Sequence, residues 1–291
     1  MATNGYKIKN IFVTGASGFI GKRLIKILLD NDYRVIVLEN KTKIIKRHKN
    51  LKIIKADLKD FRLDIYKNID VVIHLAAYLG NLKDKDESSY IKVNYDYTIR
   101  LFEMCKKNNI KFLYCSSAVV LEDQAKLDWY AKSKLMATEY IRKDVYKKWL
   151  IIYPSLVIDV KETIKGIISG FFMARIGRSD RFINIVSVDN VVLAIVKMIE
   201  KGNLIGEYVL GGINIMVGQY LRRSYQLANK FYLPLRLPQV LVKGLCFIVF
   251  GRNNLFNILS KKFLDQRLDS KKAKENFSYE IENGLELYLD K

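Results

Sequence analysis

One glycine-rich segment near the start of the chain reads Thr14-Gly15-Ala16-Ser17-Gly18-Phe19-Ile20-Gly21. It follows residues 9–14, whose apolar run predicts a strand, and it opens residues 19–29, where apolar side chains recur with helical spacing. Glycines at every third position between a strand and a helix are typical of a dinucleotide pyrophosphate site, where helix N–H groups meet the negative charge. We therefore expect cofactor contacts from Gly15, Ser17, Gly18, Phe19, Ile20 and Gly21.

The remaining chain alternates predicted strands and helices. The strands are predicted over residues 34–38, 51–55, 70–75, 111–116 and 149–153, and the helices over 87–108 and 130–147. The strands are apolar throughout, as in a parallel sheet that is covered on both faces. This pattern predicts an α/β fold with a doubly wound parallel sheet of the Rossmann type and a small C-terminal substrate-binding lobe.

After Pro154 the pattern loosens into a strand at 182–186, a helix at 189–200 and a strand at 208–210, with a turn at Gly211-Gly212. We expect residues 1–155 to form mainly the dinucleotide-binding core. Residues 156–291 would form mainly the substrate-binding lobe, with some elements returning to the core. The two parts would make one integrated domain.

Glu39 closes the second predicted strand, where a carboxylate can accept hydrogen bonds from the adenosine ribose and repel a 2′-phosphate. This position favours NAD over NADP, although Lys41, Lys43 and Arg47 offer basic groups that a 2′-phosphate could reach. Asp57 follows the third strand and is a candidate partner of the adenine amino group. A local cap is its alternative role.

The segment Tyr130-Ala131-Lys132-Ser133-Lys134 lies at the start of a predicted helix. Residues four apart share a helix face, so Tyr130 and Lys134 project together. A phenol has a pKa of about 10, and a neighbouring ammonium group favours the phenolate that accepts a proton. Ser117 ends the preceding strand at the edge where ligands bind, and it is placed to hydrogen-bond the reacting oxygen.

The chain carries a formal net charge of +20, which favours anionic ligands but does not identify one. No basic-aromatic nucleic-acid motif accompanies it, so nucleic acid is not the expected partner. The three cysteines, without metal-type spacing, suit reduced thiols in a cytoplasmic protein, and no metal is expected. Residues 240–250 are too short to span a bilayer, and a core or interface helix is preferred there over peripheral membrane contact.

The motifs together resemble the extended short-chain dehydrogenase/reductases, also called the NAD-dependent epimerase/dehydratase family. The resemblance runs through most of the chain. Beyond the two motifs above, it rests on Asp57-Leu58, His74-Leu75-Ala76-Ala77, Val93-Asn94, Ser116-Ser117, Pro154-Ser155, Val188-Asp189-Asn190, residues 206–212 and residues 269–273.

The resemblance implies that Ser117, Tyr130 and Lys134 form a catalytic triad. It implies a cofactor cleft lined by Leu58, Leu75, Ala76, Ala77 and Asn94, with Pro154 near the nicotinamide and Tyr130 and Lys134 also touching the cofactor. His74 is expected to be a buried structural histidine, and Asp189 a cap or brace. A homodimer through the helices at 87–108 and 130–147 is also implied.

Several departures bear on the reaction. Ser117 is followed by Ala118-Val119, without the Asp-Glu pair of the family's dehydratases, so dehydration is disfavoured. The segment from Ser117 to Tyr130 is short for the family, and Tyr153 replaces a common arginine. The C-terminal half is more similar to the dihydroflavonol reductase, hopanoid-associated epimerase and 3β-hydroxysteroid dehydrogenase branch, whose members often act on apolar ketones or alcohols.

The sequence thus predicts an NAD(P)-dependent oxidoreductase or epimerase that acts on a secondary alcohol or ketone, with a nucleotide-linked sugar as the leading substrate class. A reductase of an apolar ketone is the alternative within the family. A non-catalytic dinucleotide-binding or RNA-associated protein is the alternative of another class, which the complete triad argues against.

Overall fold

The computed structural model describes residues 8–39, 48–62, 68–80, 87–124, 127–168, 181–202, 204–231, 267–281 and 285–288. Within these ranges the larger sheet has seven parallel strands in the order β3-β2-β1-β4-β5-β6-β9. Their bounds are β1 Asn10–Thr14, β2 Arg34–Glu39, β3 Leu51–Lys55, β4 Val71–His74, β5 Lys111–Cys115, β6 Trp149–Pro154 and β9 Gly206–Leu210. The strand order reverses beside β1, which confirms the predicted doubly wound sheet.

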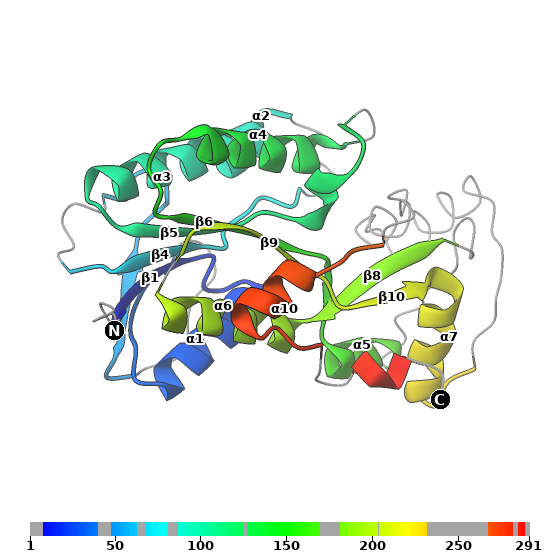
Figure 1. Ribbon diagram of the computed structural model, residues 1–291. Coiled ribbons are helices and arrows are strands. Elements are labelled where there is room, and N and C mark those ends of the chain that lie inside the picture. Colours follow the sequence, from blue (N-terminus) through cyan, green and yellow to red (C-terminus); the bar gives the residue numbers. More distant parts are fainter. Residues whose placement is uncertain are drawn as a thin grey trace.

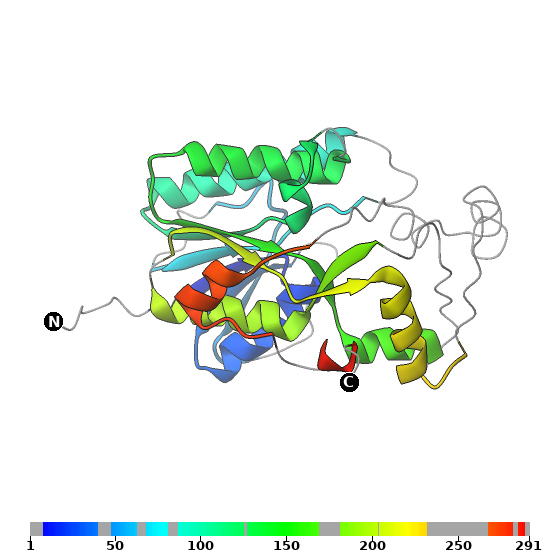
Figure 2. The same cartoon turned by 45° about the vertical axis from the view of Figure 1, so that its right-hand side comes forward.

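Helices cover both faces of this sheet (Figures 1 and 2). One face carries α2 (Glu87–Ile91), a turn of π-helix (Lys92–Asp96), α3 (Tyr97–Lys107) and α4 (Trp129–Lys143). The other face carries α1 (Phe19–Asp30), α6 (Val188–Lys201) and α10 (Lys271–Phe277). The sheet is therefore the middle layer of three.

The two faces of β1 explain why the strands read as continuous apolar runs. Ile11 and Val13 pack in the core beneath α1 and α6, whereas Phe12 points to the opposite core beneath α3 and α4. All three are fully buried, so neither face has room for a polar position. The edge strand β3 departs from this pattern, because its Lys52 and Lys55 are exposed.

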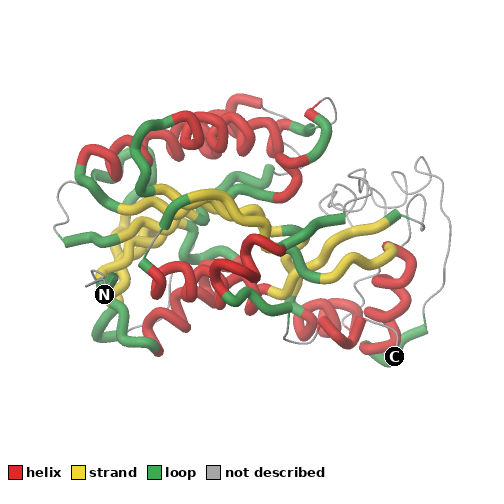
Figure 3. The backbone as a smooth tube through the Cα atoms, in the orientation of Figure 1, coloured by secondary structure: helices red, strands yellow, loops and turns green. Residues whose placement is uncertain are grey.

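A second sheet with the order β10-β8-β7 forms the centre of a smaller lobe (Figure 3). It consists of β7 (Leu156–Ile158), β8 (Phe182–Ser187) and β10 (Ile213–Met216), and it packs with α5 (Val160–Ile168), α7 (Val217–Leu227) and a 3₁₀ turn at Leu285–Tyr288. The strand predicted at 182–186 belongs to this lobe, while the one at 208–210 returns to the large sheet as β9. The C-terminal half thus contributes to both sheets.

Gly211 and Gly212, predicted as a turn, connect β9 with β10 between the two sheets. The Gly211 backbone is held on both sides, because its N–H donates to Ser270 Oγ at 2.8 Å and its carbonyl accepts from Tyr279 Oη at 2.8 Å. A side chain on Gly212 would overlap the Ile185 carbonyl of β8. Ser270, from the segment at 269–273, and Tyr279 therefore hold the junction between core and lobe.

Two predicted helices differ from those observed. The stretch 87–108 is helical but interrupted by the π-helical turn at Lys92–Asp96. The helix predicted at 130–147 begins at Trp129 and ends at Lys143. It ends early because Asp144 is extended, and its side chain accepts from the Tyr146 N–H at 2.7 Å and from Lys106 Nζ at 2.7 Å. Local side-chain bonds of this kind compete with helix continuation.

Candidate active site

The candidate site residues follow neighbouring strands at the carboxyl edge of the large sheet. The glycine loop follows β1, Leu75, Ala76 and Ala77 follow β4, Ser116 and Ser117 follow β5, and Pro154 ends β6. These four strands are consecutive neighbours in the sheet, so the topology gathers the segments at one edge. Ligands of open α/β sheets bind in the crevice outside this edge.

The glycine loop owes its shape to Gly15 and Gly21. Gly15 has φ +71°, and a side chain there would lie 2.6 Å from the Ala76 nitrogen. A side chain on Gly21 would overlap the Gly15 carbonyl, which already accepts from the Gly18 N–H at 2.9 Å. Gly18 differs, because it is exposed. A side chain there would meet a single neighbouring atom, the Gly15 carbonyl oxygen, at 3.1 Å. The loop therefore turns tightly, and its exposed backbone at Gly18 is not covered by a side chain.

Helix α1 begins immediately after this exposed backbone. Its N-cap is Gly18, which offers no side chain to bind the first N–H groups. Ser17 and Ile20 are partly exposed, and Phe19 is 49% exposed, whereas Gly21 is buried beneath the helix. An uncapped helix N-terminus carries partial positive charge and unused donors. The chain thus supplies the donor set that a pyrophosphate group requires.

His74 joins the end of β1 to α3 through two hydrogen bonds. Its Nδ1 lies 2.6 Å from Thr14 Oγ1 and its Nε2 lies 2.9 Å from Thr98 Oγ1. Because Thr98 donates onward to the Asn94 carbonyl, His74 Nε2 carries the proton and Nδ1 accepts from Thr14. Burial, with a smaller effect from Lys134, lowers the pKa of His74 to about 3. His74 is therefore a neutral buried brace, as predicted.

Asn94 lies within the π-helical turn and links three segments. Its Oδ1 accepts from the Tyr78 N–H at 2.7 Å, and its Nδ2 donates to the Tyr78 carbonyl at 2.9 Å and to Ser133 Oγ at 3.1 Å. Asn94 is fully buried, and π-turns of this kind are common at functional sites. It thereby fixes the segment that follows Ala76 and Ala77 against helix α4.

The other end of the carboxyl edge holds the candidate adenosine contacts. Glu39 ends β2 and pairs in register with Lys55 of β3. Asp57 accepts from the Lys59 N–H at 3.0 Å, a local cap geometry of the kind considered as its alternative role. Arg100 of α3 secures the same turn, donating to the Leu58 carbonyl at 3.2 Å and to the Phe61 carbonyl at 3.1 Å. Lys41, Lys43 and Arg47 lie outside the described residues.

Ser117, Tyr130 and Lys134 come together beside β5. Asp128 caps helix α4 by accepting from the Ala131 N–H at 2.9 Å, which places Tyr130 in the first turn. The Tyr130 phenol is hydrogen-bonded to the Ser117 side chain. Lys134, one turn further along, is 1% exposed, and its Nζ donates to the Cys115 carbonyl at 2.8 Å. The three predicted side chains thus share one corner of the site.

The electrostatics of this corner differ from the sequence-based expectation. Burial raises the pKa of Tyr130 above its ordinary value, and the hydrogen bond from Ser117 opposes this only partly. Burial also lowers the pKa of Lys134 to about 8. The expected shift of Tyr130 toward phenolate is therefore wrong for the protein's own groups, because desolvation is the largest effect on this phenol. The phenol holds its proton and is poised as an acid.

A buried hydroxyl pair that the sequence reasoning missed fastens helix α4 to the end of β5. Ser116 Oγ and Thr138 Oγ1 lie 2.9 Å apart, and both side chains are buried. Ser133 similarly donates to the Tyr130 carbonyl at 2.9 Å. The sequence signal that could have revealed Thr138 is its spacing, because it lies four residues after Lys134 and so on the same face of α4, toward the sheet.

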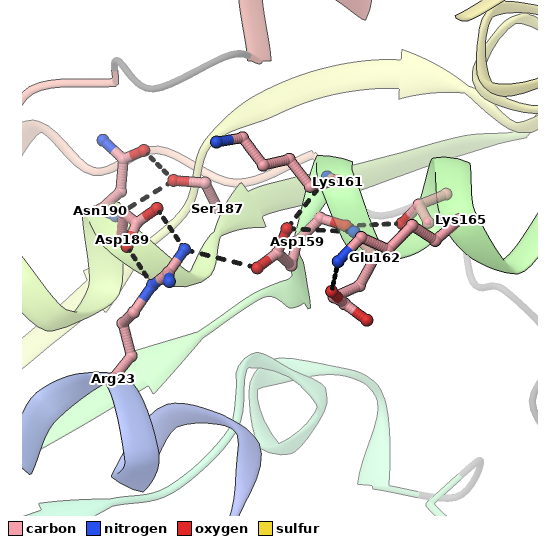
Figure 4. A network of polar contacts seen from close by, with 9 residues as sticks. Arg23, Asp159, Lys161, Glu162, Lys165, Ser187, Asp189 and Asn190 are labelled. Carbon is pink, nitrogen blue, oxygen red and sulfur yellow. Dashed lines mark hydrogen bonds and ion pairs between the residues drawn. The ribbon is translucent and has the colours of Figure 1, made fainter. Parts of the chain in front are cut away.

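Asp189 acts as a brace, as expected. Figure 4 shows Arg23 of α1 between two carboxylates. Its Nε lies 2.7 Å from Asp189 Oδ1 at the start of α6, and its Nη2 lies 3.4 Å from Asp159 Oδ2. Asp159 also accepts from the Lys161 N–H at 2.9 Å and so caps α5. The ion pairs tie the helix that follows the glycine loop to the first helix of the lobe.

Neither a metal cluster nor a membrane-spanning helix occurs within the residues described. These residues contain no group of three or more His, Cys, Asp or Glu side chains arranged to hold a metal ion. The same ranges include no helix that is long and apolar enough to cross a membrane. Residues 240–250 and Cys246 lie outside the description, while Cys105 and Cys115 are buried free thiols.

The fold defines an α/β protein of the doubly wound class. Residues 11–147, just under half of the chain, match the model of the NAD dependent epimerase/dehydratase family. The chain is 28% identical over 227 residues to the sterol-4-alpha-carboxylate 3-dehydrogenase, decarboxylating, of Dictyostelium discoideum, covering 67% of this chain and 69% of that protein.

Two further comparisons concern part of the sequence and the fold. The chain is 30% identical over 154 residues to the ADP-L-glycero-D-manno-heptose-6-epimerase of Brachyspira hyodysenteriae, covering 46% of this chain and 48% of that protein, so the match spans about half of the relative's length. The crystal structure of a Bacillus cereus UDP-glucuronic acid 4-epimerase with UDP-glucuronic acid and NAD has a TM-score of 0.75 and 22% identity, covering 95% of each chain. This likeness extends the fold over nearly the whole molecule.

Proposed function

We propose that the chain is an NAD-dependent oxidoreductase or epimerase that acts on a secondary alcohol or ketone, with Tyr130 as the general acid/base. The observation that carries the proposal is the corner formed by Ser117, Tyr130 and Lys134 at the carboxyl edge of β5. The glycine loop lies two strands away on β1, at the same edge. A non-catalytic binding protein has no need of this corner.

The residues at the carboxyl edge fit a dinucleotide. Gly15, Gly18 and the N-terminus of α1 would hold its pyrophosphate, and Glu39 its adenosine ribose, which favours NAD over NADP. Ala76, Ala77, Asn94 and Pro154 would line the path toward Tyr130. When bound, the nicotinamide would supply a hydride acceptor or donor at its C4. Solved relatives of this fold contain NAD, which supports the proposal.

The chain's own groups would handle the proton and orient the reacting oxygen. Ser117 Oγ would hydrogen-bond the carbonyl or hydroxyl oxygen of the substrate. Tyr130 Oη, with its raised pKa, would donate a proton to a carbonyl oxygen and recover it in the opposite direction. Lys134 would carry positive charge next to both groups below its pKa of about 8. The general acid is therefore in its active protonation state at neutral pH.

A nucleotide-linked sugar is the substrate class that we favour. The net charge of +20 suits a ligand that carries a diphosphate, and heptose and glucuronic acid epimerases are among the relatives. Dehydration is disfavoured, because Ser117 is followed by Ala118 and Val119 in an apolar 3₁₀ turn. These positions offer no acid or base for elimination of water.

A specific observation favours an apolar ketone as the second candidate. Tyr153 of β6, which replaces a common arginine of the family, is 2% exposed and bonds Glu207, which in turn pairs with Arg142 at 2.7 Å. The Arg142 guanidinium of this cluster is thus already paired with a carboxylate. The similarity to a sterol carboxylate dehydrogenase agrees with this alternative.

We further propose a homodimer through α3 and α4, where Trp129, Met136 and Tyr140 are between 38% and 39% exposed.

A two-panel turnover assay tests the function. Purified protein is incubated with NAD and either nucleotide sugars or sterol-type alcohols, and products are followed by NADH absorbance and by NMR for epimers. We expect turnover with nucleotide sugars, and Tyr130→Phe should lower it about 100-fold or more while NAD binding persists. Turnover that is unchanged in Tyr130→Phe would refute the assignment of Tyr130. Turnover of sterols alone would select the second candidate. Light scattering tests the dimer, which a monomeric mass would contradict.

A further inference from the structure

Lys134 is a buried ammonium group without a carboxylate partner. It is 1% exposed, and over the described ranges it forms no ion pair with Asp or Glu. The Cys115 carbonyl, 2.8 Å from Nζ, is a neutral acceptor. A charge in this position would ordinarily be lost by deprotonation unless something else compensates the missing water.

The titratable groups that surround Lys134 are themselves neutral. On β5, burial raises the pKa of the Cys115 thiol to about 11, and on β4 the pKa of His74 is lowered to about 3. Burial likewise raises the pKa of Tyr130 on α4 and that of Tyr153 on β6, a neighbour of Tyr114. None of these side chains supplies a negative charge at neutral pH.

Tyr114 of β5 supplies the remaining contact. Nζ of Lys134 lies 4.8 Å from the centroid of the Tyr114 ring, within the range of a cation–π interaction. The ring is held rigidly, because it is fully buried and stacks on His74 at 5.8 Å and on Phe112 at 6.4 Å between centroids. Its hydroxyl group is buried and has no hydrogen-bond partner in the described part of the chain. The ring therefore interacts with Lys134 through its π face.

We propose that the Tyr114 ring is a positioning residue that keeps the Lys134 ammonium group charged and in place. The contact with Lys134 stands on geometry alone, whereas its importance for catalysis rests on the proposed function. A ring face stabilises a desolvated cation by an amount equivalent to about one pKa unit. Without the ring, the pKa of Lys134 would fall from about 8 to near 7. A large share of the lysine would then be neutral at physiological pH.

The test compares Tyr114→Leu with Tyr114→Phe, which removes the unpaired hydroxyl group but retains the ring. Unfolding equilibria are measured with urea between pH 6 and pH 9 at constant ionic strength. Because the folded-state pKa of Lys134 is depressed from 10.5 to about 8, its charge opposes folding: the penalty is complete below the folded pKa, declines above it, and vanishes only above the unfolded pKa. A further fall in the folded-state pKa of Lys134 enlarges this penalty only below about pH 8. The folding equilibrium constant of Tyr114→Phe divided by that of Tyr114→Leu should therefore be about tenfold larger at pH 6 than at pH 9.

The Lys134→Met background is the matched control. In that background the difference in unfolding free energy between Tyr114→Leu and Tyr114→Phe should be the same at every pH, since it reflects packing alone. Tyr114→Met replaces Tyr114→Leu if the latter does not fold. A pH-independent difference in the Lys134 background, or one that grows toward pH 9, would overturn the role of Tyr114. The assay uses neither substrate nor cofactor, so its failure leaves the proposed function standing, and loss of that function leaves this result unaffected.

Discussion

Lys134 is costly to bury as a charged group, and this cost should be visible in the pH dependence of stability. Its pKa falls from 10.5 to about 8 on folding, mainly through desolvation. Protonation therefore opposes folding below pH 8, and the penalty disappears as the pH rises toward 10.5. We expect Lys134→Met to be more stable than the wild type at pH 7 by roughly 2 kcal/mol, with a smaller gain at pH 9.5. Urea unfolding at both values measures this, and an equal gain at both would contradict it.

The glycine loop offers a second residue-scale prediction, with Gly18 and Gly21 as a matched pair. A methyl group on Gly21 would overlap the Gly15 carbonyl and approach Ala16 Cα at 2.9 Å, so Gly21→Ala should cost about 2 kcal/mol of stability. Gly18→Ala meets only the Gly15 carbonyl at 3.1 Å and should cost less than about 1 kcal/mol. It should nevertheless weaken NAD binding about tenfold or more, because backbone approach to the pyrophosphate is blocked. Undiminished NAD binding by Gly18→Ala would refute this use of the loop.

At the scale of elements, helix α4 depends on the hydroxyl pair that joins it to β5. Thr138→Val preserves the shape of the side chain but leaves the buried Ser116 hydroxyl without its partner, and we expect a loss of about 1–2 kcal/mol. The double variant Ser116→Ala/Thr138→Val should be more stable than the sum of the two single losses indicates. Chemical denaturation of the four proteins gives this coupling. Strict additivity would mean that the pair does not hold the helix.

The elements themselves show which parts of the fold the sequence could predict. Strands β1, β2, β4, β5 and β6 were predictable, because each has an apolar central run that is largely buried on both faces of the sheet. The π-turn at Lys92–Asp96 was not, since its cause is the set of side-chain bonds of Asn94 to distant segments. The early end of α4 depended on Asp144 in the same way. Spacing predicted the proximity of Tyr130 and Lys134, but it could not reveal the desolvation that sets their pKa values.

At the scale of the whole molecule, a net charge of +20 should make the folded state sensitive to salt. Self-repulsion destabilises a compact highly charged chain, and added ions screen it. We expect the thermal midpoint to rise by a few degrees between about 20 mM and 200 mM NaCl, a range in which the Debye length shortens several-fold. Scanning calorimetry over this range checks the expectation. A midpoint that falls with salt would indicate that ion pairs such as Arg23–Asp189 outweigh the repulsion.

The central claim is that the carboxyl edge of the large sheet is an NAD site, and direct titration tests it. Calorimetric titration of the purified protein with NAD and, separately, with NADP measures both affinities on the same sample. We expect one NAD site per chain, with NADP bound more weakly because Glu39 opposes the 2′-phosphate. Tighter binding of NADP would contradict the role of Glu39. Binding of neither dinucleotide would contradict the claim itself.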